Sequence, residues 1–145
     1  MCSAAYADEI ADDLLFRTGR AVITNDAKSL IACFEFPFII GTQDGTRMIE
    51  AQDGLLQILE RLRRYYSDNN VVDVVRTVVS AKFENPNSIG TTSVARLIQP
   101  AGKQFRAPYP IYSTLSNQSG SWKIVSCTYA ILDSPDHNKA LLAGL

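Results

Sequence analysis

The sequence predicts an α+β domain in which a curved antiparallel sheet wraps around three N-terminal helices. Three helix-like stretches, interrupted by one short hairpin, fill the first half of the chain. Segments rich in β-branched and aromatic residues, separated by turn residues, fill the second half. The length of 145 residues suits a single domain, 1–145, with a core over about residues 4–132 and a tail over 133–145.

Composition narrows the classes of partner. The formal net charge is −1, with 14 Lys and Arg against 15 Asp and Glu, so we expect no nucleic-acid partner. No apolar run approaches the roughly 20 residues that span a bilayer, so we expect no membrane partner. The N-terminus lacks a basic segment followed by a long apolar one, which indicates a cytoplasmic location rather than secretion.

The cysteines indicate neither a disulfide framework nor a metal site. There are 3 of them, Cys2, Cys33 and Cys127, and no two form a Cys-x-x-Cys pair. We expect Cys33 and Cys127 to be small buried apolar residues, because apolar or β-branched neighbours flank both, and we expect Cys2 in a mobile terminus. No metal and no cofactor is therefore predicted.

Periodicity and capping residues predict the helices. The first runs over residues 4–23, where Ser3 supplies the N-cap and acidic residues follow in the first turns. A break at Asn25 and Asp26 precedes a short second helix over 27–34, which Pro37 is expected to stop.

The hairpin and the third helix follow. Two short strands, 38–40 and 46–49, flank an Asp-Gly turn, which is a strong hairpin signal. The third helix spans 54–66, and Asp53 is placed to cap it. Its core-facing stripe has i, i+4, i+7, i+11 spacing and consists of Leu55, Leu59, Leu62 and Tyr66.

Four strands are predicted in the second half of the chain, joined by turns rich in Asn, Gly, Pro and Ser. The predicted strands span 71–84, 91–99, 108–115 and 121–132, and the tail is expected either to form a helical turn at 139–142 or to be disordered.

This order of elements resembles the nuclear transport factor 2-like superfamily, which includes ketosteroid isomerase, scytalone dehydratase and polyketide-cyclase-like proteins. The local matches are Leu30-Ile31-Ala32-Cys33-Phe34, Val78-Val79-Ser80 and Gly120-Ser121-Trp122-Lys123-Ile124. The resemblance implies a cone-shaped α+β barrel with an apolar pocket between helices and sheet, and a homodimer formed through the outer sheet face. It implies no single function, because this fold carries many activities.

The sequence departs from the catalytic sets of the enzymatic members. Isomerase-like members carry a carboxylate at the first short strand, but residues 38–42 contain no acid and Asp44 falls in a turn. Tyr6 lies too early in the first helix to match their tyrosine, and Phe16 occupies a later turn. Dehydratase-like members carry a histidine where Thr77 stands, and the only histidine, His137, is expected to be solvated in the tail.

The remaining candidates leave open which side of each strand faces the pocket. If the side of Asp73 and Thr77 does, Asp73 is a catalytic base near apolar walls; otherwise it is a hydrated residue at the rim. Arg76 and Arg96 either bind a ligand carboxylate or point outward at a dimer interface. Phe16, Tyr112 and Trp122, and also Tyr109 and Tyr129, either line the ligand cavity or pack in the core or interface.

Three hypotheses follow from these candidates. The first is a binding protein for a small, largely apolar molecule, with Phe16, Thr77, Arg96, Tyr112 and Trp122 as ligand-binding residues. The second is an isomerase, cyclase or dehydratase that uses Asp73 in acid–base chemistry. The third is a protein-interaction or dimerisation module, whose apolar surface consists of Val72, Val74, Val78, Val94 and Ile98 if their side of the strands faces outward.

Overall fold

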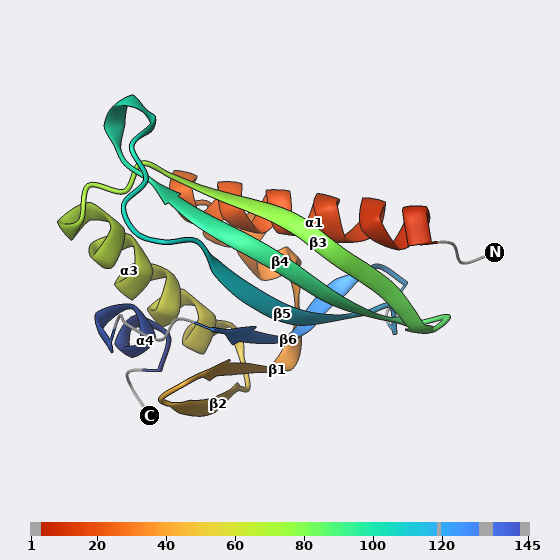
Figure 1. The fold of residues 1–145 in the computed structure, drawn as a ribbon. Helices are drawn as coiled ribbons and strands as arrows, with labels where there is room; N and C mark the ends of the chain where they lie inside the picture. Colours follow the sequence, from red (N-terminus) through yellow and green to blue (C-terminus); the bar gives the residue numbers. More distant parts are fainter. Residues whose placement is uncertain (1–3, 119, 131–134, 143–145) are drawn as a thin grey trace.

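The computed structural model describes residues 4–118, 120–130 and 135–142 (Figure 1). The helices are α1 (Ala4–Thr24), α2 (Ala27–Ala32), α3 (Gln52–Asp68) and α4 (Pro135–Leu142), with one 3-10 turn, η1 (Pro100–Gly102). The strands are β1 (Phe34–Thr42), β2 (Gly45–Ile49), β3 (Asp73–Asn85), β4 (Ser88–Ile98), β5 (Tyr109–Ser116) and β6 (Lys123–Tyr129). Cys2 and Ser3, and their predicted roles, lie outside the described residues.

The strands form one six-stranded sheet in the order β2-β1-β6-β5-β4-β3. Strands β3 to β6 form the predicted antiparallel meander, and β1 joins β6 in parallel. Within the described chain, the end strands β2 and β3 do not pair with each other, so the sheet is curved but open. The expectation of a barrel is therefore wrong, while the α+β class with a wrapped sheet is confirmed.

The helices cover the concave side of this sheet. Helix α1 lies along β3, and α3 packs against the C-terminal helix α4 beside the β1 end of the sheet (Figure 1). The core between the layers contains Phe38, Ile89, Leu97, Leu115 and Ile124, whose side chains are almost completely buried. Burial of apolar surface of this kind is the main stabilising term of a domain this size.

Strand register determines which residues face the interior. On β3, Val74 pairs with the buried Leu97 and Arg76 pairs with the buried Ala95, so even-numbered residues point inward there. The odd-numbered side chains Val75 and Thr77, which alternate with these residues, are exposed on the outer face. A register shift between Val78 and Ser80 then reverses the parity, since Ala81 is buried further along the strand.

The passage from α2 into β1 differs from prediction. Helix α2 ends at Ala32, and β1 already begins at Phe34, so the first short strand is longer than predicted. Pro37 lies within β1 instead of ending a helix. The pairing of β1 with β6 is interrupted between Phe34 and Ile39, and a proline without an amide donor is tolerated where the ladder has no bond to make.

The C-terminal segment forms α4 rather than a single helical turn. His137 lies in this helix and only 1% of it is exposed, so the expectation of a solvated histidine is wrong. Its ring packs between Tyr65, Tyr109 and Tyr129, with centroid distances of 5.2, 5.6 and 6.1 Å. These partners come from α3, β5 and β6, and the α3 residue, Tyr65, lies far from the tail in the sequence.

Candidate functional site

A small cavity lies between the helices and the concave face of the sheet. Its volume is about 30 Å³, which is space for one or two water molecules. Leu141 of α4 contributes to its wall and is 1% exposed. The remaining lining residues are mostly apolar: Thr18, Val22, Leu30, Phe34, Ile40, Leu55, Ile58, Leu59, Leu62, Arg76, Cys127 and Tyr129.

Arg76 is the charged residue of this lining. It projects from β3 on the inward parity, opposite Ala95, whose short side chain leaves room for it. Its Nε atom is buried and makes no hydrogen bond, and no ion pair joins Arg76 to another described residue. Burying a cation without a partner is costly, so the interior of this protein contains an uncompensated positive charge.

The groups around Arg76 are neutral near pH 7. Burial raises the pKa of Tyr66 to about 12 and also raises the pKa values of Tyr109 and Tyr129 well above the ordinary tyrosine value. Burial also raises the pKa of the Cys127 thiol. None of these four groups therefore supplies a negative charge to Arg76 at neutral pH.

The pKa of Arg76 itself reflects two opposing causes. Burial, the larger single cause, lowers it, whereas Tyr129, Tyr66 and Tyr109 together raise it, and the net direction is upward. These phenols act in that way only where they are ionised, far above pH 7. At neutral pH the guanidinium is charged, and no negative charge of these phenols offsets the free-energy cost of burying it.

His137 adds no compensating charge. Burial lowers its pKa to about 3, and the positive charges of Arg106 and Arg76 act in the same direction. The imidazole is therefore neutral over the physiological range.

Phe16 and Asp73 lie outside this cavity, in a surface groove between α1 and β3. The groove has a volume of about 270 Å³ and is lined by Leu15, Phe16, Arg20, Asp73, Val74, Val75 and Arg76. Asp73 is partly buried, and its Oδ1 accepts a hydrogen bond of 2.9 Å from the Val74 amide. Phe16 is 67% exposed. Arg76 borders both the groove and the interior cavity, so it stands between them.

Three other predicted residues lie on the outer face of the sheet. Thr77 is exposed, Tyr112 is 48% exposed and pairs with Thr92 and Thr128, and Arg96 lies opposite Val75. The described lining of the interior cavity includes none of them. Val74 is buried and Val78 packs against the core, so the expectation that the two belong to an outer apolar face is wrong. The alternation of β3 assigns that face to its odd-numbered residues instead.

Trp122 lies at the end of the molecule near the start of α1. Its ring is partly buried and meets Phe83 edge-on, with a centroid distance of 5.9 Å, and Phe83 in turn contacts Tyr6 at 6.0 Å. This aromatic cluster packs the β3–β4 hairpin against the β5–β6 turn and α1. Trp122 therefore does not border the interior cavity.

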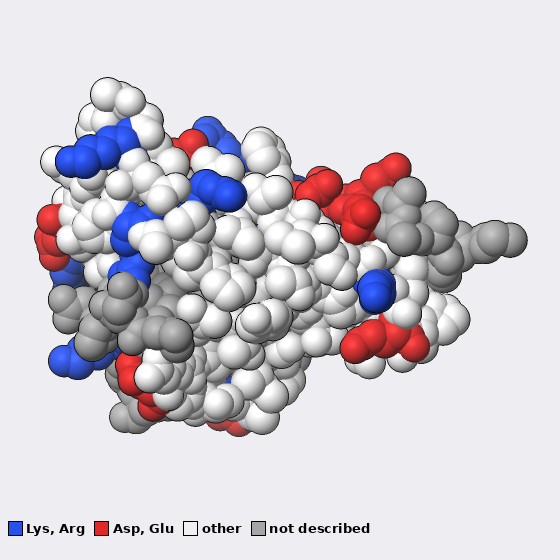
Figure 2. Space-filling model, viewed as in Figure 1, with Lys and Arg blue, Asp and Glu red and all other residues white. Residues whose placement is uncertain are grey.

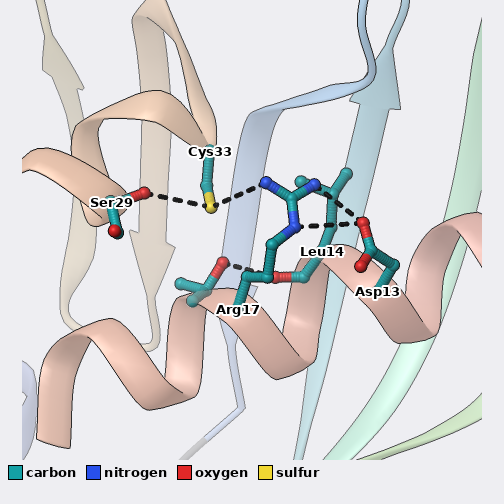
Figure 3. A network of polar contacts seen from close by, with 6 residues as sticks. Asp13, Leu14, Arg17, Ser29 and Cys33 are labelled. Carbon is teal, nitrogen blue, oxygen red and sulfur yellow. Dashed lines mark hydrogen bonds and ion pairs between the residues drawn. The ribbon is translucent and has the colours of Figure 1, made fainter. Parts of the chain in front are cut away.

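A polar network connects α1 with the end of α2 (Figure 3). Arg17 donates to Asp13 Oδ2 through Nε at 3.0 Å and Nη2 at 2.8 Å, and its Nη1 lies 3.9 Å from Cys33 Sγ. The thiol donates to the Ser29 carbonyl at 3.4 Å. Cys33 and Cys127 are both buried and unbridged, which confirms their predicted role as small core residues.

The sequence offered Tyr129 as a candidate for the cavity wall, and it does line the cavity, but nothing in the sequence placed Cys127 or His137 near Arg76. The side of β3 that faces inward would have distinguished Arg76 from Thr77. The sequence does not reveal that side, because valines occupy both the even-numbered and the odd-numbered positions around these two residues. Tyr66 could have been found, because it ends the apolar stripe of α3. Among the described residues, no cluster of His, Cys, Asp or Glu is arranged to hold a metal ion, and no helix has the length and hydrophobicity to cross a membrane.

The cone of helices and sheet identifies the fold as nuclear transport factor 2-like, as the sequence resemblance predicted. Solved structures match it over most of their length. A protein of unknown function with a cystatin-like fold from Nostoc punctiforme has 12% identity and a TM-score of 0.70, over 92% of this chain and 97% of that one.

Two further structures agree. A nuclear transport factor 2-like protein of unknown function from Shewanella oneidensis has 11% identity and a TM-score of 0.64, over 85% and 98% of the two chains. A nuclear transport factor 2-like protein from Novosphingobium aromaticivorans has 16% identity and a TM-score of 0.64, over 95% and 90%. No protein-family model matches the sequence, and no curated protein matches it significantly. At these identities the similarity establishes the fold alone.

Proposed function

We propose that this protein binds a small, largely apolar molecule between its helices and the concave face of its sheet. The observation that supports this proposal is the cavity in that position, whose walls are apolar side chains from α1, α2, α3, α4 and the sheet. Such a concave, mostly apolar site with few polar groups is the usual form of a small-molecule site.

The cavity must widen to accept more than one or two waters. Leu141, from the C-terminal helix α4, and Leu30, from the short helix α2, both line it. Small outward shifts of these two helices would enlarge the cavity without breaking the sheet. The proposal therefore predicts that binding of a guest is accompanied by movement of these two helices.

Neutral alcohols test the apolar site. We expect 1-butanol, 1-hexanol and 1-octanol to bind with rising affinity, measured by calorimetry or by shifts in NMR spectra, because each buried methylene adds about 0.8 kcal/mol. Val22→Phe places a ring in the cavity and should abolish binding, while Val79→Phe, the same change at a side chain that is 64% exposed, should not. No binding to the wild type, or equal binding by both variants, would contradict the proposal.

We further propose that the protein forms a homodimer through the outer face of its sheet. The exposed apolar side chains there support this: Ile39 is 41%, Tyr112 48% and Val79 64% exposed. The middle of the molecule over β3, β4 and β5 has few charged side chains, which gather toward the two ends (Figure 2). Exposed apolar areas of this kind are typical of interaction sites.

Analytical ultracentrifugation tests the dimer. Tyr112→Lys introduces a charge at the middle of the outer face and should convert a dimer to a monomer. Phe16→Lys, at a residue 67% exposed on α1, is the matched control and should leave the dimer intact. A wild-type monomer at tens of micromolar, or equal dissociation by both variants, would exclude this interface.

A further inference from the structure

We infer that the molecule bound in the cavity carries a carboxylate, or an anion of the same planar shape, and that Arg76 is its anchor. This inference rests on the proposed apolar site and adds the chemical class of the ligand. It starts from the placement of Arg76 at the boundary between the interior cavity and the α1–β3 groove.

The guanidinium has hydrogen-bonding capacity that the protein does not use. An arginine has five N–H donors in a planar fork, and the buried Nε of Arg76 has no acceptor. No hydrogen bond or ion pair of Arg76 to any described residue satisfies the others. An ionised donor of this kind, left unpaired in an apolar interior, matches an anionic ligand better than a neutral one.

The surroundings exclude an internal counter-ion among the described residues. Asp73 lines the neighbouring groove, but it lies on the outward parity of β3 and forms no ion pair with Arg76. The phenols of Tyr66, Tyr109 and Tyr129 lie close enough to interact electrostatically with Arg76 and are neutral near pH 7. Of the three, Tyr129 lines the cavity beside Arg76, and as neutral phenols none of them competes with an anion for the cation.

The shape of the two spaces orients the ligand. The groove between α1 and β3 gives an anion a path to Arg76 from solvent, and Arg20 on the same groove adds a second positive charge. Beyond Arg76, the cavity presents Val22, Leu59 and Leu62. A molecule with a carboxylate head at Arg76 and an aliphatic or aromatic body among these side chains satisfies both regions.

Paired acids and amides test the inference on the full chain. Acetate, butyrate and hexanoate are titrated against acetamide, butyramide and hexanamide, each amide being the neutral match in size of its acid. We expect hexanoate to bind at least about tenfold more tightly than hexanamide, because a bidentate charged pair replaces neutral hydrogen bonds. Arg76→Gln should remove this preference, and Arg96→Gln, the same change on the outer face, should retain it.

The outcomes separate this inference from the proposed function. Equal binding of acid and amide by the wild type, with affinity rising with the length of the alkyl chain, would refute the inference of an anionic ligand. It would still support the proposed apolar site. Absence of binding by every probe would overturn both. The comparison of acid with amide needs no variant, and a shift of the Arg76 Nε–H resonance on addition of acetate is expected even if Arg76→Gln fails to fold. An unchanged resonance at saturating acetate would refute the pairing.

Discussion

Replacement of Arg76 by methionine should stabilise the unliganded protein, which is the opposite of what most core substitutions do. Methionine retains an unbranched apolar stem that fills the same space and removes the charge. The effective desolvation penalty of a buried ion is several kcal/mol. Arg76 is only partly buried as a residue, although its Nε is fully buried, so we take the lower end of that range.

We expect the free energy of unfolding to rise by about 1–2 kcal/mol at pH 7. For a chain of this size the melting temperature should rise by roughly 3 °C per kcal/mol. Urea unfolding followed by the fluorescence of Trp122 measures the difference, and the m value should not change.

Arg96→Met on the outer face is the control, and we expect a change within about 0.5 kcal/mol. A loss of 1 kcal/mol or more in Arg76→Met, with Arg96→Met unchanged, would refute the reasoning, because it would mean that Arg76 makes stabilising contacts. A gain in stability accompanied by loss of hexanoate binding would show that stability is sacrificed at the site for recognition.

Further predictions concern His137 and the walls of the cavity. The pKa of His137 is lowered to about 3 in the folded protein, so the folded state binds fewer protons than the unfolded chain below the ordinary histidine pKa of about 6.5. The stability that the neutral His137 contributes is therefore fully present above about pH 6.5 and is lost, at up to about 1.4 kcal/mol per pH unit, as the pH falls from about 6.5 to about 3. His137→Phe should flatten the dependence of the free energy of unfolding on pH in this window. An unchanged slope would contradict a buried, neutral imidazole. Leu59→Ala should cost about 2–5 kcal/mol in urea unfolding, because Leu59 is 3% exposed and its truncation enlarges the cavity. Phe16→Ala should change stability by less than about 0.5 kcal/mol, since the ring is 67% exposed, and a large loss would place Phe16 in a contact that the structure lacks.

The fold was predictable because local signals agree with one another along the chain. The stripe of Leu55, Leu59 and Leu62 defines the buried face of α3, and all three are buried. The Asp-Gly turn correctly places the β1–β2 hairpin. The strands of the second half are marked by β-branched residues and turns, and their order in the meander follows the sequence. Pro37 was misread, because its effect depends on a break in the ladder with β6 that no local pattern reveals.

The site was less predictable, because it depends on strand parity and on a segment far along the chain. Val74, Val75, Val78 and Val79 are apolar on both sides of β3, so alternation gives no direction, and the register with β4 decides that Arg76 rather than Thr77 points inward. When valines occupy both faces of a strand, the sequence pattern does not show which face is buried and which is exposed.

The sequence by itself therefore determined the class of this protein: an α+β cone with an amphipathic third helix, an antiparallel meander and no metal-binding pattern. Only the tertiary structure decided that Arg76 lies at an apolar cavity without a counter-ion among the described residues, and that α4 brings His137 against three tyrosines. The physical reason is that helix and strand formation depend on neighbours a few residues apart, whereas burial of a charge depends on what distant segments place around it.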